Sequence, residues 1–250
     1  MKKTFRTLLL VLLVCLTGFL AWQFLHSREP VYQGKPLTAW LEQFSTNHFT
    51  HRGGVADKQA EEAIRQIGTN ALPLLLKLIT SKDSPFKKRM EAILPKRWQG
   101  PLVSRQAWDR QMLGAYGFVA LGTVAEPAVR TLIDLASGTD PDIRYFAVYA
   151  LGHLGSAAKP AIPLLIKRLE DPVEHVRGDA MNGLAGIHLQ PELVVPVFIQ
   201  YAGDSERDSG TRYTAIQGLG YFGSEAKAAV PTLLRLLNDP DANIRLGVTN

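Results

Sequence analysis

The stretch DPDIRYFAVYALGHLGSAAKP, residues 140–160, contains each part of a pattern that recurs through the chain. An Asp-Pro turn opens it, and Ala147, Leu151 and Leu154 follow at spacings of i, i+4 and i+7. Residues at these spacings share one face of an α-helix, so the pattern predicts an amphipathic helix. Gly155 comes directly after the last apolar residue, where a helix commonly ends because glycine adopts left-handed backbone angles without strain.

The same three columns occur in five copies, most of them 33 to 35 residues apart. Their members are, in order, Ala60, Gly114, Ala147, Ala180 and Ala215; Ile64, Phe118, Leu151, Leu184 and Leu219; and Ile67, Leu121, Leu154, Ile187 and Phe222. The small first column allows neighbouring helices to approach closely. Glycine follows the third column in four copies. His188 stands there in the fifth, which we interpret as local variation because histidine tolerates left-handed angles better than most residues.

A second helix is predicted after each of these stops. Pro127 and Pro160 lie where a helix can begin. Beyond them, apolar residues recur at helical spacing in three more columns: Leu132, Leu165, Phe198 and Leu233; Ile133, Ile166, Ile199 and Leu234; and Ala136, Leu169, Ala202 and Leu237. One such pair of helices cannot bury its apolar face alone, so the units must stack. The sequence therefore predicts an all-α fold, an α-solenoid of helix pairs over residues 59–250.

The linkers between units carry aspartate and arginine at matched places. DPVEHVR at 171–177 and DPDANIR at 239–245 match each other, whereas DPDIR at 140–144 is two residues shorter and DSGTR at 208–212 lacks the proline. We expect the aspartates to cap helix N-termini. The arginines are expected to form a structural ladder along the stack, at Arg144, Arg177, Arg212 and Arg245.

The turn D-P-x-x-x-[VI]-R and the helix end A-x-x-A-L-G-x-[LI]-G resemble those of bacterial HEAT repeats, including a subclass similar to the repeats of phycobilisome lyases. The resemblance covers about residues 59–250. It implies a stack of helix pairs. Such repeats occur in scaffolds, in adaptors and in some lyase subunits, so the resemblance does not choose among these functions.

An apolar segment near the N-terminus predicts a transmembrane helix. Residues 8–25, LLLVLLVCLTGFLAWQFL, contain no charged side chain. As a helix they would span ~27 Å, close to the ~30 Å hydrocarbon core of a bilayer. The basic tail 1–7 is expected to stay cytoplasmic, which places the repeats in the periplasm or outside the cell. We favour an uncleaved, single-pass signal anchor; a cleaved secretory signal and a lipoprotein signal at Cys15 are the alternatives.

The juxtamembrane segment 26–58 contains a second short amphipathic pattern. Leu37, Trp40, Leu41 and Phe44 have helical spacing. They predict a capping helix at 36–44 that covers the open face of the first unit. The surrounding sequence resembles a Y-x-G-K-x-L-x-x-W-L element found ahead of the repeats in membrane-anchored bacterial HEAT proteins. Residues 47–57 are expected to form a polar loop.

An insertion at about 81–110 interrupts the period, because Gly68 and Gly122 are 54 residues apart. It is rich in basic residues and holds Trp98 and Trp108. One interpretation is a patch that binds anionic lipid headgroups or an acidic partner. The other is a helical insertion with a solvated charged face and tryptophans packed on the solenoid. The candidate basic residues are Lys87, Lys88, Arg89, Lys96 and Arg97.

Composition and motifs argue against catalysis and against nucleic acid. The net charge is +5, and beyond the basic tail the chain has nearly equal numbers of acidic and basic residues, whereas phosphate binding needs a strong positive field. Cys15, the single cysteine, lies in the apolar segment. No P-loop, dinucleotide fingerprint or nucleophile elbow is present. His48 and His51 fix too few ligands for a metal site. We predict no enzyme activity, no cofactor and no metal.

The predicted function is a membrane-anchored scaffold that binds another protein. Second helices usually line the concave face of such stacks, so we predict a partner-binding stripe on them, although any solvated helix face is polar. The apolar residues of the last second helix suggest self-association. The alternatives are a lyase-like enzyme or enzyme subunit, and anionic membrane binding through the insertion. The stripe consists of Asp134, Lys167, Arg168, Gln200, Tyr201 and Arg235.

Overall fold

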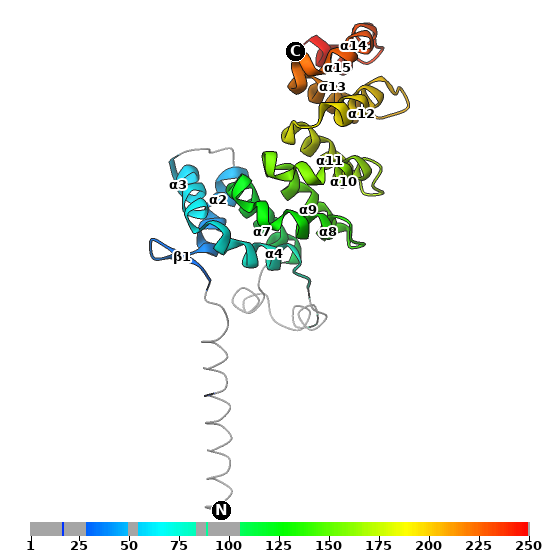
Figure 1. Ribbon diagram of the computed structural model, residues 1–250. Helices are drawn as coiled ribbons and strands as arrows, with labels where there is room; N and C mark the ends of the chain where they lie inside the picture. The colour runs from blue at the N-terminus through cyan, green and yellow to red at the C-terminus, as the bar shows by residue number, and fades with distance from the viewer. Residues whose placement is uncertain (1–16, 18–28, 50–54, 84–88, 90–105, 250) are drawn as a thin grey trace, which may run out of the picture.

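The computed structural model describes residues 17, 29–49, 55–83, 89 and 106–249. Apart from a two-stranded hairpin, the elements in these ranges are helices, stacked one after another as Figure 1 shows. The elements, with η for a 3₁₀ helix, are β1 (Val31–Tyr32), β2 (Lys35–Pro36), α2 (Leu37–Phe49), α3 (Val55–Ile67), η1 (Gly68–Ala71), α4 (Leu72–Ile79), α7 (Ala107–Leu121), η2 (Gly122–Ala128), α8 (Val129–Ala136), α9 (Pro141–Gly152), η3 (Gly155–Ala161), α10 (Ile162–Arg168), α11 (Glu174–Ile187), α12 (Pro191–Gly203), α13 (Ser209–Phe222), η4 (Gly223–Ala229), α14 (Val230–Leu236) and α15 (Ala242–Thr249).

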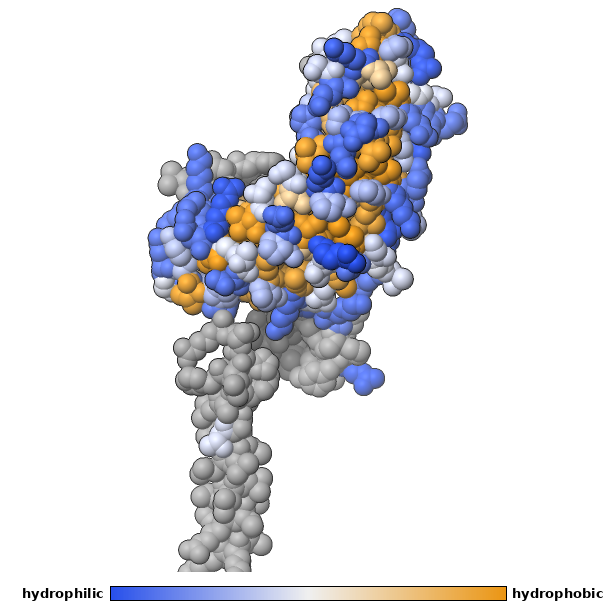
Figure 2. Space-filling view, viewed as in Figure 1, coloured by the Kyte–Doolittle hydropathy of each residue, from blue (hydrophilic) through white to orange (hydrophobic). Residues whose placement is uncertain are grey.

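The three predicted first-helix columns form the core of the stack, together with part of the second-helix columns. Every member of the three first-helix columns is buried, from Ile64, which is fully enclosed, to Ile67, which is 8% exposed. In the second helices, Leu132, Leu165 and Phe198 are fully buried. On the surface, Figure 2 shows apolar residues gathered along the stacked helices, with polar residues beside them. The burial confirms the predicted all-α solenoid, because these columns can be covered only by neighbouring units.

The turns between paired helices follow the expected backbone geometry. Gly68, Gly122, Gly155 and Gly223 all have positive φ. His188 takes the same left-handed conformation, with φ 50° and ψ 47°. In three units a seven-residue 3₁₀ helix then leads into the second helix, so Pro127 and Pro160 lie within η2 and η3 rather than at the start of an α-helix. After His188 there is no such segment, and α12 begins directly at Pro191.

The N-terminal cap is longer than predicted. α2 runs from Leu37 to Phe49, beyond the predicted end at residue 44, and α3 begins at Val55. The predicted loop 47–57 is therefore partly helical, because no glycine or proline interrupts the chain before Gly53. As predicted, Leu37, Trp40, Leu41 and Phe44 are buried; α2 contacts α3 and α7.

The hairpin before α2 was not expected from the sequence. Val31 pairs with Pro36 and Tyr32 with Lys35. The two residues between the strands, Gln33 and Gly34, have positive φ, as a tight hairpin turn requires. The Trp40 indole nitrogen donates to the Tyr32 carbonyl oxygen at 3.1 Å, which ties the hairpin to the cap.

Neighbouring units are joined mainly through their first helices. α7, α9, α11, α13 and α15 each pack on the next, whereas consecutive second helices contact each other much less. α9 and α11 approach backbone to backbone: a Cβ atom added to Gly152 would lie 2.7 Å from the Gly183 Cα atom. The stack is therefore tighter on the side of the first helices.

The two ends of the insertion are held together at the stack. Asp83 accepts a hydrogen bond from the Ala107 amide at 3.1 Å and pairs with Arg110 at 3.1 Å. Gln111 donates to the Ser81 carbonyl oxygen at 3.0 Å. Residues 107–110, predicted as insertion, belong instead to α7, whose last turns follow the core pattern.

The transmembrane prediction concerns residues 8–25, which lie outside the described ranges except for Thr17. Within those ranges one stretch, Ala107–Ala136, is long and apolar enough to cross a membrane. It spans α7, η2 and α8, and 61% of its most apolar window is buried inside the protein. Its hydrophobicity is therefore that of a core segment.

Candidate functional site

The four arginines of the predicted ladder fall into two different roles. Arg144 holds Asp171 of the next linker with both Nε and an Nη atom, at 2.7 and 3.0 Å. Arg212 pairs with Asp239 through its two Nη atoms, at 2.5 and 3.4 Å, while its Nε donates to the Ala202 carbonyl oxygen. Arg177 and Arg245 instead donate to backbone carbonyl oxygens of their own linkers, at 2.9 and 2.6 Å. We call these two Arg–Asp ion pairs arginine rungs. One joins α9 to the turn before α11, and the other joins α13 to the turn before α15.

The aspartates also differ from the single role predicted for them. Asp140 and Asp208 cap α9 and α13 through the amides of the third residue on, as expected. Asp171 and Asp239 come from the longer linkers, so the next helix begins too far away for them to cap it. Burial alone would raise the pKa of Asp171, but hydrogen bonds from Arg144 and from the Val173 amide hold the pKa below its usual value.

No rung of this kind joins α11 to α13 in the part of the chain that is described. At this position Arg207, in the linker between α12 and α13, makes the ion pairs instead. It pairs with Glu170 at 2.8 Å and with Asp204 at 3.2 Å. Its guanidinium lies 3.7 Å from the centre of the Tyr201 ring. The Tyr201 hydroxyl donates to Glu170, and this bond, followed by that from Arg207, lowers the pKa of Glu170.

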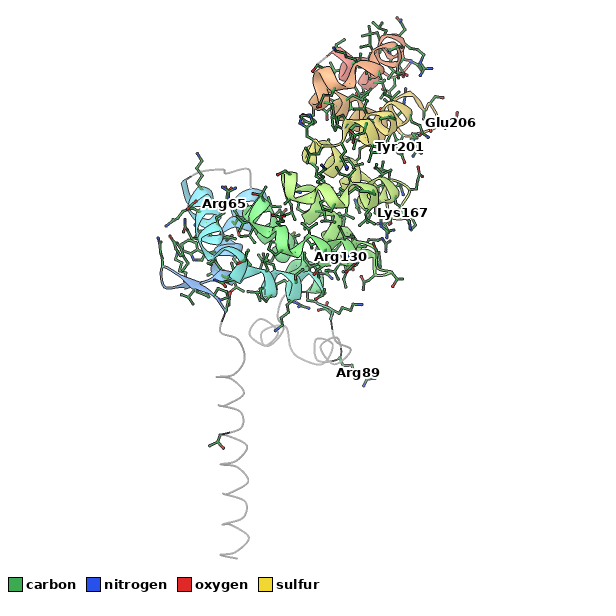
Figure 3. All side chains as sticks on the ribbon, viewed as in Figure 1. Arg65, Arg89, Arg130, Lys167, Tyr201 and Glu206 are labelled. Atoms are coloured by element: carbon green, nitrogen blue, oxygen red, sulfur yellow. The ribbon has the colours of Figure 1, made fainter. Side chains whose placement is uncertain are left out.

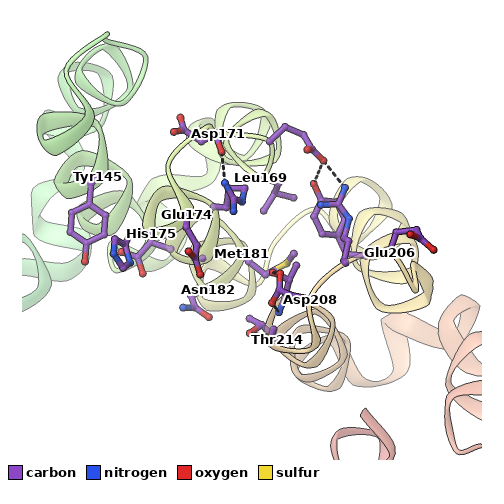
Figure 4. Close-up of a pocket in the computed structure, with 18 residues that line it drawn as sticks. Tyr145, Leu169, Asp171, Glu174, His175, Met181, Asn182, Glu206, Asp208 and Thr214 are labelled. Atoms are coloured by element: carbon purple, nitrogen blue, oxygen red, sulfur yellow. Dashed lines mark hydrogen bonds and ion pairs between the residues drawn. The ribbon is translucent and has the colours of Figure 1, made fainter. Parts of the chain in front are cut away.

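A cavity of about 690 Å³ opens where this rung is missing. It is lined by residues from α9, α11, α12 and α13 and from the linkers before α11 and α13. Figure 4 shows Tyr145 and His175 at one end and Glu206, Asp208 and Thr214 at the other. Its carboxylates outnumber its cations; the acidic residues are Glu170, Asp171, Glu174, Asp179, Glu206 and Asp208, and the arginines are Arg177 and Arg207.

Asp179 is the most perturbed carboxylate of this cavity. Burial raises its pKa to about 6, although hydrogen bonds from Tyr145 and Asn182 and the nearby His175 oppose the rise. Its Oδ2 atom is buried and has no hydrogen-bond partner within the described ranges. Burial and the negative field of Asp179 also raise the pKa of Tyr145 to about 12. Burial therefore outweighs the hydrogen bonds and the nearby His175 in setting the pKa of Asp179.

A second cavity of about 600 Å³ continues along the same seam. It shares Asn182 and Thr214 with the first cavity and reaches His188 and Tyr221 at the far ends of the two helices. We call the two adjoining cavities the α11–α13 groove. The groove combines carboxylates at the linker end with small and aromatic residues at the other end.

The predicted partner-binding stripe lies on the second helices, and of its six residues Tyr201 also lines the first cavity of the groove. Lys167 and Gln200 are exposed there, as are Asp134 and Arg235. Tyr201, in contrast, is only 5% exposed, because its ring packs under Arg207. Arg130, Lys167 and Tyr201 follow one another along the stack in Figure 3.

Arg168 of the stripe is also committed to contacts within the protein. It donates to the Ala136 carbonyl oxygen at 2.9 Å and pairs with Asp171 at 3.2 Å. Together with the burial of Tyr201, these contacts leave four of the six predicted stripe residues exposed to solvent. Arg168 and Tyr201 therefore face the protein rather than the solvent, which helical spacing alone does not reveal.

The other predicted sites are placed only in part. Of the basic residues in the insertion, Arg89 is described and exposed, and Lys87, Lys88, Lys96 and Arg97 lie outside the described ranges. Trp108, which lies in α7, packs against the Tyr145 and Phe146 rings, with centroids 5.5 and 4.7 Å apart, and is 42% exposed. Trp98 lies outside the described ranges, so both interpretations of the insertion stay predictions.

His48 lies in α2 and His51 lies outside the described ranges. No group of three potential metal ligands occurs in those ranges. On the apolar face of the last second helix, Leu234 and Leu237 are 60% and 39% exposed, and self-association through them stays a prediction.

The sequence pattern does not indicate the carboxylates that line the groove. Glu174, Asp179 and Glu206 belong to no repeating column, so nothing in the periodicity singles them out. A signal was nevertheless present: Arg177 and Arg212 are 35 residues apart, two more than the neighbouring pairs of ladder arginines. The longer interval marks the linker in which the contact between units changes.

Comparison with known families agrees with this architecture. The family described as HEAT repeats matches residues 118–185, and the family described as PBS lyase HEAT-like repeat matches residues 211–239. The chain therefore contains repeats that match the HEAT-repeat families over these two ranges. A similar solved structure is the crystal structure of an engineered protein, with 17% sequence identity, a TM-score of 0.44, and coverage of 85% of this chain and 93% of that chain. No curated protein matches the sequence.

Proposed function

We propose that this chain is a membrane-anchored scaffold that binds another protein through the α11–α13 groove and catalyses no reaction itself. HEAT repeats support a role in protein interaction, because a stack of helix pairs offers a long, rigid surface. The observation that carries the choice of site is the pair of adjoining cavities at the seam without an arginine rung.

The site can be tested by photo-crosslinking in native cells. A photoreactive amino acid at Asn182, which lines both cavities, should give a crosslinked product with the partner. The same amino acid at Gln200, exposed on α12, is the matched control and should give none. Products at Gln200 without products at Asn182 would assign the partner to the second-helix stripe. No product at either position would contradict a scaffold that acts through either surface.

The membrane anchor is the second part of the proposal. It is supported by residues 8–25, which carry no charge and follow a basic tail. The orientation proposed is a cytoplasmic N-terminus with the repeats exported. Carbonate extraction tests it: the protein should stay in the membrane pellet with its N-terminus intact. A mature protein that is released by carbonate and lacks its first twenty or so residues would replace the anchor by a cleaved signal.

A further inference from the structure

The dimensions of the α11–α13 groove suit an extended chain. It follows α11 from Glu174 to His188, which at the rise of an α-helix is about 21 Å. An extended polypeptide advances ~3.3 Å per residue, so the groove has room for about six residues. Each of the two cavities, at about 690 and 600 Å³, is large enough to take several side chains.

The linker end of the groove is negatively charged after its internal pairs are counted. Asp171 is neutralised by Arg144 and Arg168, and Glu170 by Arg207. Four other carboxylates, Glu174, Asp179, Glu206 and the α13 cap Asp208, line the cavity without an ion pair in the described part of the chain. Arg177 stays as the facing cation, with its guanidinium bonded to backbone oxygens. A cationic group entering here gains attraction from several directions.

The opposite end of the groove is less charged and more apolar. Ala185 and Gly186 leave room on α11, and Tyr221 of α13 is 64% exposed beside them. His188 closes this end; its ring contacts Phe222 and lies 3.9 Å from Glu225. An exposed tyrosine beside small residues is a common setting for a partner's apolar side chain, because it buries area without ordering a flexible group.

We propose that the α11–α13 groove binds an extended segment of about six residues from a partner protein, with a lysine or arginine side chain at the Glu174 end and an apolar side chain at the Tyr221 end. The proposal rests on the scaffold function and names the chemistry of its partner. Charge complementarity selects the occupant: a basic segment fits the unpaired carboxylates, and an acidic segment is repelled by them.

A metal ion is a poorer occupant than a peptide. The described residues contain no group of three potential ligands close enough to hold one. The carboxylates are instead spread over α11 and the linker before α13. Spread charges suit a long, flexible cation such as a lysine or arginine side chain, whose stem also packs against aromatic rings such as Tyr145.

The buried carboxylate Asp179 gives the binding a pH dependence. Tyr116, Tyr145 and Tyr149 on the packed helices and His175 on its own helix are the titratable groups that face it. With a pKa of about 6, Asp179 gains full charge above that pH. A bound cation favours the charged form, so affinity for a basic segment should rise as the pH increases from 5 to 7.

Fluorescence polarisation with the full chain in detergent micelles tests the proposal. The probes are fluorescein-labelled hexapeptides: Lys-Arg-Ser-Gly-Leu-Phe, the same sequence reversed, and Glu-Asp-Ser-Gly-Leu-Phe. One of the two basic probes should bind at least about tenfold more tightly than the acidic probe. Glu174→Lys should weaken the basic probe about tenfold, and Tyr221→Ala should weaken it by a smaller factor of about three to five.

Glu192→Lys is the matched control for Glu174→Lys. Both glutamates stand in the first turn of a helix, so the two changes alter charge and helix termini alike, but Glu192 does not line the groove. Equal loss in both variants, tighter binding of the acidic probe, or no binding of any probe up to about 1 mM would overturn the proposal. Crosslinking at Asn182 that persists in such a case would keep the scaffold function and require a different occupant.

Discussion

Replacing Arg144 by methionine should destabilise the stack more than any change at an exposed arginine. The Arg144 side chain is 7% exposed and its partner Asp171 is fully buried, with two hydrogen bonds between them. Methionine fills a similar volume, so the change mainly removes charge and donors. Removal of one partner from a buried ion pair costs about 3–5 kcal/mol, because the other charge stays buried without compensation.

The lower end of that range applies here. Asp171 keeps Arg168 at 3.2 Å and the Val173 amide at 3.0 Å, so it is not left wholly unpaired. The change also removes the bond from Arg144 to the Gly138 carbonyl oxygen. A loss of about 3 kcal/mol corresponds to a melting temperature about 6–12 °C lower for a protein of this size.

Thermal unfolding followed by circular dichroism at pH 7 measures the effect. Arg130→Met is the control, because Arg130 is 87% exposed and lies 3.7 Å from Asp134; its loss should change stability by less than about 1 kcal/mol. The pKa of Asp171 is held below its usual value, so the stabilisation is present at neutral pH and is lost as the pH falls through that lowered value. Equal melting temperatures for the two variants at pH 7 would refute the reasoning.

Three further changes probe other contacts. Asp179→Asn should raise the free energy of unfolding at pH 8 by up to ~3 kcal/mol, since the raised pKa of Asp179 favours its neutral form. The variant should also lack the increase in stability that the wild type shows as the pH falls from about 7 to 4. Identical pH profiles of stability for the two proteins would contradict this. Gly183→Ala should cost about 1–3 kcal/mol in urea denaturation, because the new Cβ atom would lie 2.9 Å from the Gly152 Cα atom, whereas Gly178→Ala, with no neighbour within 4 Å, should be neutral or stabilising. Arg177→Ala should lower the melting temperature by only a few degrees, because it removes bonds to backbone oxygens and leaves no buried carboxylate unpaired.

The core of this fold could be predicted because its apolar residues recur at helical spacing within each helix. Ala147, Leu151 and Leu154 share a face through helix geometry alone, whatever the neighbouring units do. The left-handed turn at His188 followed from its alignment with glycine. Both inferences need only the residues of one helix pair, which is why the single sequence sufficed.

The groove could not be predicted, because it depends on contacts between units. Asp140 and Asp171 begin similar linkers, yet the first caps a helix and the second accepts an arginine from the preceding unit. Two additional linker residues make the difference. In the same way, Glu174 and Glu206 are 32 positions apart and line one cavity only when α11 and α13 are stacked. Pairings across such distances are not visible in helical spacing.

The hydrogen bond between Asp83 and Ala107 bears on which insertions the chain can accept. Asp83 and Ala107 are 24 positions apart in the sequence, and a direct hydrogen bond joins them. The ends of the segment between these two residues are therefore fixed next to each other. Doubling the length of such a loop costs only ~0.6 kcal/mol of closure entropy. This position can therefore accept longer or shorter sequences, including a whole fluorescent protein, while the helices on either side keep their register.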